Sequence, residues 1–200
     1  MTSRCTATRL RLIGGCRLAD SDDIPQNPTP NVDDLGRRIT NIVSNSKCAD
    51  FIKSLINKAA ELTGNPAASN SALDLFSSIK GQGGFVYGDT IKRAYGFEGG
   101  TVHGSISGGN AQVEFPFPVP FRSFGPVNQR AAAAYAEAQA GIQAMVGLHE
   151  IIHLAGKGFD DYALSNAVAA MRGVTAPKFA NVRRASEYWN GALEAACKPK

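Results

Sequence analysis

The sequence predicts an α+β fold: a mainly helical domain with a small antiparallel β-hairpin or sheet ahead of a helix near residue 150. Three observations support this fold class. Apolar residues recur at helical spacing over residues 31–79, as expected of helices that bury one face. Ala111, Val113 and Phe115 alternate with polar residues, as on a half-buried strand. From residue 129 the chain is rich in alanine, which has the highest helix propensity.

Three helices are expected in the N-terminal part of the domain. The segment Gly64-Asn-Pro66 should end the second helix, because glycine and proline are typical helix terminators. The third should run from about Ser71 to Ile79, opened by Ser71 with Asp74 three residues later, which resembles a capping box with Asp in place of Glu. The first two helices are predicted by their apolar stripes, which are Leu35, Ile39, Ile42 and Val43, and Phe51, Ile52, Leu55, Ile56, Ala59 and Leu62.

Short strands are predicted next, at Phe85–Tyr87 and Thr101–Ile106. The turn Ser107-Gly-Gly-Asn110 then leads into the alternating segment that ends at Phe115, which predicts a β-hairpin. The following Phe115–Phe121 contains three prolines. Because proline lacks the N–H that a central strand donates, this stretch should be an extended arm over the core or along a cleft.

The C-terminal half is predicted to be helical. One helix should start near Asn128, with Gly141 and Gly147 as weak points that divide or bend it. Two more are expected, at residues 161–171 and 180–196, from their apolar periodicity.

One domain is expected, spanning residues 31–200 after a flexible leader or linker at residues 1–30. The leader carries arginines and prolines but no signal-peptide core, and an alternative is that the chain is the end of a longer protein. Cys48 and Cys197 either form a disulfide between the two ends of the domain or are two buried thiols. The disulfide would favour a secreted or extracytoplasmic protein.

Composition excludes some classes of partner. The formal net charge is +4, but the cations are scattered, which argues against nucleic-acid binding. No apolar stretch approaches the ~20 residues of a membrane span.

The segment His149-Glu-Ile-Ile-His153 is the main chemical motif of the chain. Histidines four residues apart lie on one face of a helix, so both imidazoles can reach a single Zn²⁺. The glutamate beside the first histidine can then act as a general base. The alternative is a metal-free helix whose histidines are satisfied by carboxylates or water, but the surrounding apolar residues make an unpaired imidazole costly.

These residues resemble the zinc helix of the zincin metallopeptidases, over the motif and the Ala155-Gly156 that follows. The resemblance implies a zinc ion as cofactor, Glu150 as the catalytic base and a peptide or protein substrate. It also implies that an edge strand upstream of the zinc helix, here one strand of the hairpin, pairs with extended substrate.

The third ligand departs from the HExxHxxGxxH pattern, because Phe159 occupies the position of the third histidine. No histidine follows His153, so the third ligand is expected to be a carboxylate, a water or another oxygen donor. Asp161 is preferred because it heads the next helix, although the same position suits a helix N-cap. Asp160 ranks second. The gluzincin arrangement would use a glutamate of the C-terminal helical segment, which carries Glu187 and Glu194, and Glu187 ranks third.

Other residues are weaker candidates. His103 can bind substrate or an oxyanion, but a lone strand histidine is more often a surface residue. Tyr162 and Tyr188 are candidate oxyanion donors, although structural tyrosines are commoner. The sequence therefore predicts a zinc metallopeptidase; the alternatives are an inactive metal-binding domain and a metal-free helical interaction domain.

Overall fold

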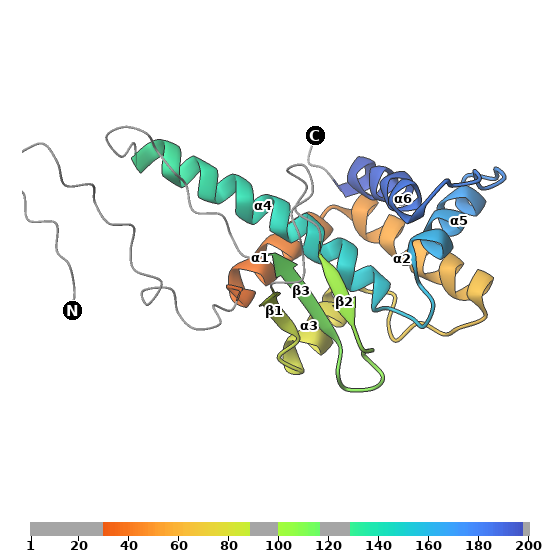
Figure 1. The fold of residues 1–200 in the computed structure, drawn as a ribbon, viewed down its shortest axis with the longest axis horizontal. Coiled ribbons are helices and arrows are strands. Elements are labelled where there is room, and N and C mark those ends of the chain that lie inside the picture. The colour runs from red at the N-terminus through yellow and green to blue at the C-terminus, as the bar shows by residue number, and fades with distance from the viewer. Residues whose placement is uncertain (1–29, 89–99, 117–128, 198–200) are drawn as a thin grey trace, which may run out of the picture.

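The computed structural model describes residues 30–88, 100–116 and 129–197, and the fold is given for these ranges. They form a mainly helical domain with one small sheet (Figure 1), so the α+β class is confirmed. All of the predicted leader except Pro30 lies outside the described residues, as does the proline-rich arm beyond Pro116. The elements are α1 (Val32–Val43), α2 (Ser46–Thr63), α3 (Ala72–Gly81), β1 (Phe85–Gly88), β2 (Thr101–His103), β3 (Gln112–Pro116), α4 (Gln129–His153), α5 (Asp161–Met171) and α6 (Val182–Cys197).

The ends of the N-terminal helices follow the predicted signals. Gly64 caps α2 in the left-handed conformation with a φ of 69°, which glycine adopts at little cost. The Ser71 side chain accepts a hydrogen bond from the Asp74 backbone N–H and caps α3. The contact from Ser71 satisfies a backbone N–H that the start of a helix leaves without a partner.

The sheet has the strand order β1-β3-β2. β2 and β3 pair antiparallel, with Val102 opposite Val113, and this confirms the predicted hairpin. β1 instead pairs parallel to β3, with Phe85 opposite Val113, so the expectation of a purely antiparallel sheet was wrong. The reason is topological: the chain reverses direction between β1 and β2 and again between β2 and β3, which restores the direction of β1. β2 is left at an edge.

The inner face of the sheet packs on the helices through phenylalanines. The rings of Phe85 and Phe115 stack with centroids 6.4 Å apart, and Phe76 of α3 lies 5.0 Å from Phe85. All three side chains are buried with Val113. This core fixes the position of the sheet beside α4.

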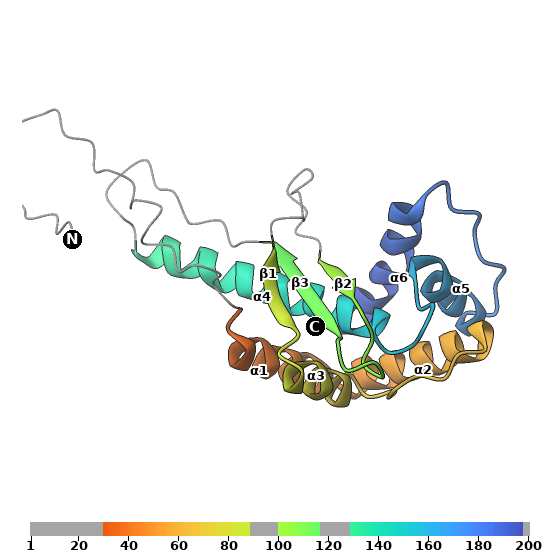
Figure 2. The ribbon, with the colours of Figure 1, turned by 60° about the horizontal axis from the view of Figure 1, so that its bottom comes forward.

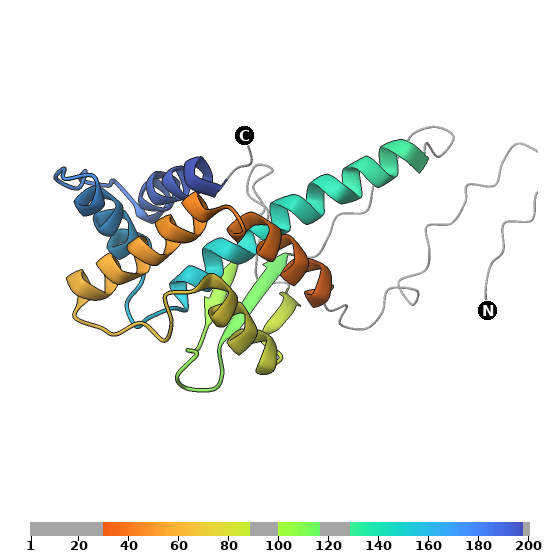
Figure 3. The same ribbon diagram turned by 180° about the vertical axis from the view of Figure 1, so that it is seen from behind.

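α4 runs without interruption from Gln129 to His153. The predicted division of the helix at Gly141 or Gly147 is therefore wrong. A Cβ on Gly147 would lie 3.3 Å from both Leu35 and Phe115, so this glycine lets α1 and β3 approach the helix closely. The C-terminal half of α4 crosses behind the sheet, whereas its N-terminal half extends beyond the other elements (Figures 1 and 3). Within the described ranges, no helix combines the length and apolarity needed to cross a membrane.

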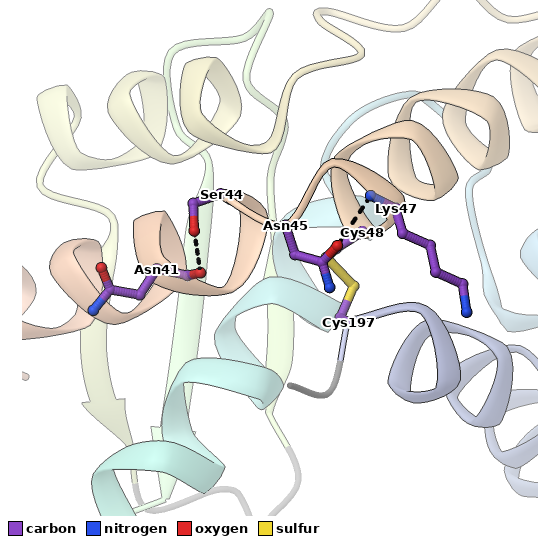
Figure 4. Close-up of a disulfide and its surroundings, with 6 residues drawn as sticks. All are labelled: Asn41, Ser44, Asn45, Lys47, Cys48 and Cys197. Carbon is purple, nitrogen blue, oxygen red and sulfur yellow. Dashed lines mark hydrogen bonds between the residues drawn. A yellow bond between two sulfur atoms is a disulfide. The ribbon is translucent and has the colours of Figure 1, made fainter. Parts of the chain in front are cut away.

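α2, α5 and α6 form a second group of helices beside the end of α4 (Figure 2). The buried Ser165 hydroxyl of α5 donates to the Ala185 carbonyl of α6 at 2.6 Å. At the other end of α6, Cys197 forms a disulfide with Cys48 near the start of α2 (Figure 4), which confirms one of the two expected states of these cysteines. α6 is therefore attached to its neighbours at both ends.

Candidate metal centre

The last turn of α4 presents both motif histidines on one face. Leu148, Ile151 and Ile152, which lie next to the histidines in the sequence, are fully buried and fix the rotation of the helix. The Nε2 atoms of His149 and His153 consequently lie 3.2 Å apart. This one-turn geometry is the one predicted from the i, i+4 spacing.

The turn after α4 fixes the orientation of His153. The Nδ1 atom of His153 lies 2.5 Å from the carbonyl oxygen of Phe159, and a carbonyl only accepts, so Nδ1 carries the proton. The Phe159 ring packs against Gly156, where a Cβ would come within 2.6 Å of the ring. The backbone of Gly156 also pairs with Ala67, which ties the turn to the loop after α2.

The carboxylate that joins the histidines comes from Asp161. Its Oδ1 lies 3.6 Å from His153 Nε2 and 3.9 Å from His149 Nε2. Asp160, the second-ranked candidate, is exposed and accepts from the Ala163 N–H at 2.8 Å as the N-cap of α5. Asp161 therefore faces the histidines, whereas the N-cap role that was also considered for it belongs to Asp160. Glu187, the third candidate, pairs with Arg183 and Arg184.

Two residues of α6 that the sequence did not single out also contact the site. Trp189 is fully buried, stacks on His149 with centroids 4.0 Å apart and donates from Nε1 to Asp161 Oδ1 at 2.8 Å. The Oδ1 atom of Asn190 lies 3.3 Å from His149 Nδ1. The apolar stripe of α6 could have pointed to both residues. It predicts that Trp189, the only tryptophan of the chain, is buried, and it places Asn190 at the edge of the stripe.

Glu150 lies beside the histidines and is 7% exposed. The backbone N–H of Gly100, directly before β2, hydrogen-bonds to its carboxylate. A Cβ at Gly100 would approach the Glu150 side chain to 2.6 Å. This close backbone contact therefore holds the Glu150 carboxylate.

Burial and mutual charge determine the protonation of the cluster. Burial, reinforced by the charge of His153, lowers the pKa of His149 to about 3. Burial also opposes ionisation of Asp161, but hydrogen bonds from His153 and Trp189 outweigh it and lower the pKa of Asp161 to about 2. The pKa of His153 is raised despite its burial, chiefly by Asp161. Burial raises the pKa of Glu150 to about 7.

The donor set suits a metal ion. His149, His153 and Asp161 each offer one ligand atom, all within 4.8 Å of one another. Ligands placed 2.0–2.2 Å from zinc at tetrahedral angles are about 3.3 Å apart, and the separations of 3.2, 3.6 and 3.9 Å are close to this value. When His153 gives up the Nε2 proton that it donates to Asp161, its Nε2 atom, the Nε2 atom of His149 and Asp161 Oδ1 are all free to bind, so the cluster could hold a cation.

The cluster opens into a cleft of about 1890 Å³. The cleft is bordered by Ile142 and Val146 of α4, Val102 of β2, Ser105 of the hairpin turn, and Glu187 and Glu194 of α6. β2 pairs only with β3 among the described strands. Thr101 and Val102 of β2 border the cleft.

The remaining candidates lie away from the cluster. His103 contacts Glu114 at 3.0 Å and its side chain is 54% exposed. Tyr162 and Tyr188 pack around Phe179, and neither borders the cleft. Comparison with known protein families, curated proteins and solved structures found no match to the chain.

Proposed function

We propose that this protein is a zinc-dependent metallopeptidase. The observation that carries the proposal is the convergence of His149, His153 and Asp161 on one point, with the buried Glu150 beside them. Two imidazoles and one carboxylate form the donor set of many catalytic zinc sites, which keep one position open for water or substrate. A structural zinc site, by contrast, is closed by four protein ligands.

When bound, zinc would supply Lewis acidity that activates water and polarises a carbonyl. Glu150 would accept the proton of the attacking water on its carboxylate and deliver it to the leaving amine nitrogen. Attack of the water oxygen forms the new C–O bond, and the C–N bond of the peptide breaks once its nitrogen is protonated. The products are a carboxylate and a protonated amine, which takes up both protons of the water. The N–H of Gly100 keeps the Glu150 carboxylate in place for both transfers.

The cleft supports an extended polypeptide as substrate. Its volume of about 1890 Å³ exceeds the 300–1,000 Å³ typical of small-molecule pockets. Thr101 and Val102 on β2 border it, and the edge of β2 that pairs with no other described strand offers backbone donors and acceptors. A substrate segment would add to this edge by main-chain hydrogen bonds.

The first test is metal content, measured by mass spectrometry on the purified protein after incubation with zinc. We expect about one zinc per chain in the wild type, none in His153→Ala and a sharp reduction in Asp161→Ala. Asp160→Ala is the matched control, because it removes the neighbouring carboxylate, which caps α5 and does not face the histidines. Equal loss of zinc in both aspartate variants would remove Asp161 as the ligand.

The second test separates hydrolysis from metal binding. Glu150→Gln should retain zinc but lose cleavage of quenched-fluorescent peptides by a factor of about 10² or more, as expected for removal of a general base. Zinc without cleavage in the wild type would favour the alternative of an inactive metal-binding domain. A wild type without zinc would leave a metal-free helical domain.

A further inference from the structure

A chain of polar groups leads from α6 to His149. Asn190 donates from Nδ2 to Glu194 Oε1 at 3.1 Å, and its Oδ1 faces His149 Nδ1 at 3.3 Å. A carboxylate only accepts hydrogen bonds, so Glu194 selects the orientation of the Asn190 amide in which its NH₂ group points to the carboxylate. The amide oxygen then faces the imidazole and holds the His149 proton on Nδ1.

A competing arrangement exists because the two histidines face each other. With His149 protonated on Nε2, that proton would be donated to His153 Nε2, only 3.2 Å away, across the point where the ligand atoms converge. His153 is protected from the equivalent change, because its Nδ1 faces the backbone carbonyl of Phe159. His149 depends instead on a side-chain amide, which can turn and present either its oxygen or its nitrogen.

Trp189 restrains the ring of His149 but not its proton. The indole stacks on the imidazole with an interplanar angle of 23°, which fixes the plane of the ring. Its N–H is used by Asp161 and is not available to His149. Beside the Nε2 contact with His153, the position of the His149 proton therefore depends on Asn190 and, through it, on Glu194.

We infer that Glu194 is a positioning residue of the metal centre: through Asn190 it keeps the His149 proton on Nδ1 and leaves Nε2 free to bind a metal. This inference rests on the proposed function, because Glu194 has this role only if His149 binds a metal. Polar partners behind metal-binding histidines typically change metal affinity by 10- to 100-fold.

The test uses Glu194→Gln. A glutamine can donate or accept, so the Asn190 amide is free to turn. We expect the zinc Kd, measured by competition with a chromogenic chelator, to rise about 10-fold. In the metal-free variant, ¹⁵N NMR of the imidazoles should show His149 moving from the Nδ1–H toward the Nε2–H tautomer. The chain has only three histidines, which makes the spectrum assignable.

Glu187→Gln is the matched control. It makes the same change of charge on the same helix and at the same cleft, but Glu187 contacts Arg183 and Arg184 rather than the site. Its zinc Kd and His149 tautomer should equal those of the wild type. Adding Asn190→Asp to Glu194→Gln should restore the Nδ1–H tautomer, because an ionised aspartate only accepts.

The inference is overturned if metal-free wild type carries the His149 proton on Nε2, or if Glu194→Gln leaves both tautomer and zinc Kd unchanged. Its failure is distinguishable from that of the proposed function. Absence of zinc binding in the wild type overturns the peptidase, whereas the NMR comparison of metal-free proteins reports on Glu194 without any metal. Unchanged thermal unfolding in each variant verifies that the comparison is between folded proteins.

Discussion

Removal of the Cys48–Cys197 disulfide should destabilise the domain considerably. The two cysteines are 149 residues apart, so the bond closes almost the whole domain into one loop. The loop-closure relation gives an entropy loss of about 17 cal/mol/K for the unfolded chain, or about 5 kcal/mol at 25 °C. Measured losses range from about 2 to 5 kcal/mol for native disulfides, and we expect the upper part of that range.

The perturbation is Cys48→Ala with Cys197→Ala. Alanine is chosen because both positions are buried, where a serine hydroxyl would add a desolvation cost. Cys5 and Cys16, which lie outside the described residues, are replaced by serine in the variant and in the reference protein. This keeps other thiols out of the measurement.

The free energy of unfolding is measured by equilibrium denaturation in guanidinium chloride, with the slope and midpoint fitted separately. The reference protein with its disulfide reduced should match the alanine variant. A variant within about 1 kcal/mol of the oxidised reference would refute the reasoning from loop closure. Two titratable thiols in the unfolded, unreduced reference would refute the pairing itself.

Two glycines allow sharper tests of the site. Gly100→Ala should place a Cβ 2.6 Å from the Glu150 side chain and displace its carboxylate; peptide cleavage should fall by about 10² while zinc content is unchanged. Gly141→Ala, at the same cleft with open space around it, is the control and should raise stability by about 0.5–1 kcal/mol. Gly156→Ala should push the Phe159 ring aside and weaken zinc binding measurably in the chelator assay; unchanged affinity would contradict the role of this turn in orienting the adjacent histidine.

Local rules were sufficient to predict much of the helical part of the fold. Capping by Ser71 and termination by Gly64 depend on backbone groups a few residues apart, and α1 to α3 accordingly lie close to where they were expected. The predicted division of α4 at Gly147 was wrong, because this glycine serves a contact at long range, the approach of Leu35 and Phe115. The residue pattern of α4 alone does not show which distant residues pack against Gly147.

The candidate site divides in the same way. The spacing of His149 and His153 fixes their relation through helix geometry alone. Asp160 and Asp161 are both acidic and adjacent, so the sequence could not tell which caps α5 and which faces the histidines. Trp189 reaches the site because α6 packs on α2 and α5, which brings its ring against His149 of α4. The sequence pattern of α6 does not show this packing, so Trp189 was missed.

The stacked indole gives the protein an intrinsic optical reporter. Trp189 is the only tryptophan, it is excluded from solvent, and it contacts both a histidine and the aspartate of the cluster. Its emission therefore arises from one environment, and a change of charge at those two side chains acts directly on the fluorophore. A fluorescence titration of the unlabelled protein should thus follow occupancy of the site in real time, without a substrate and without a probe.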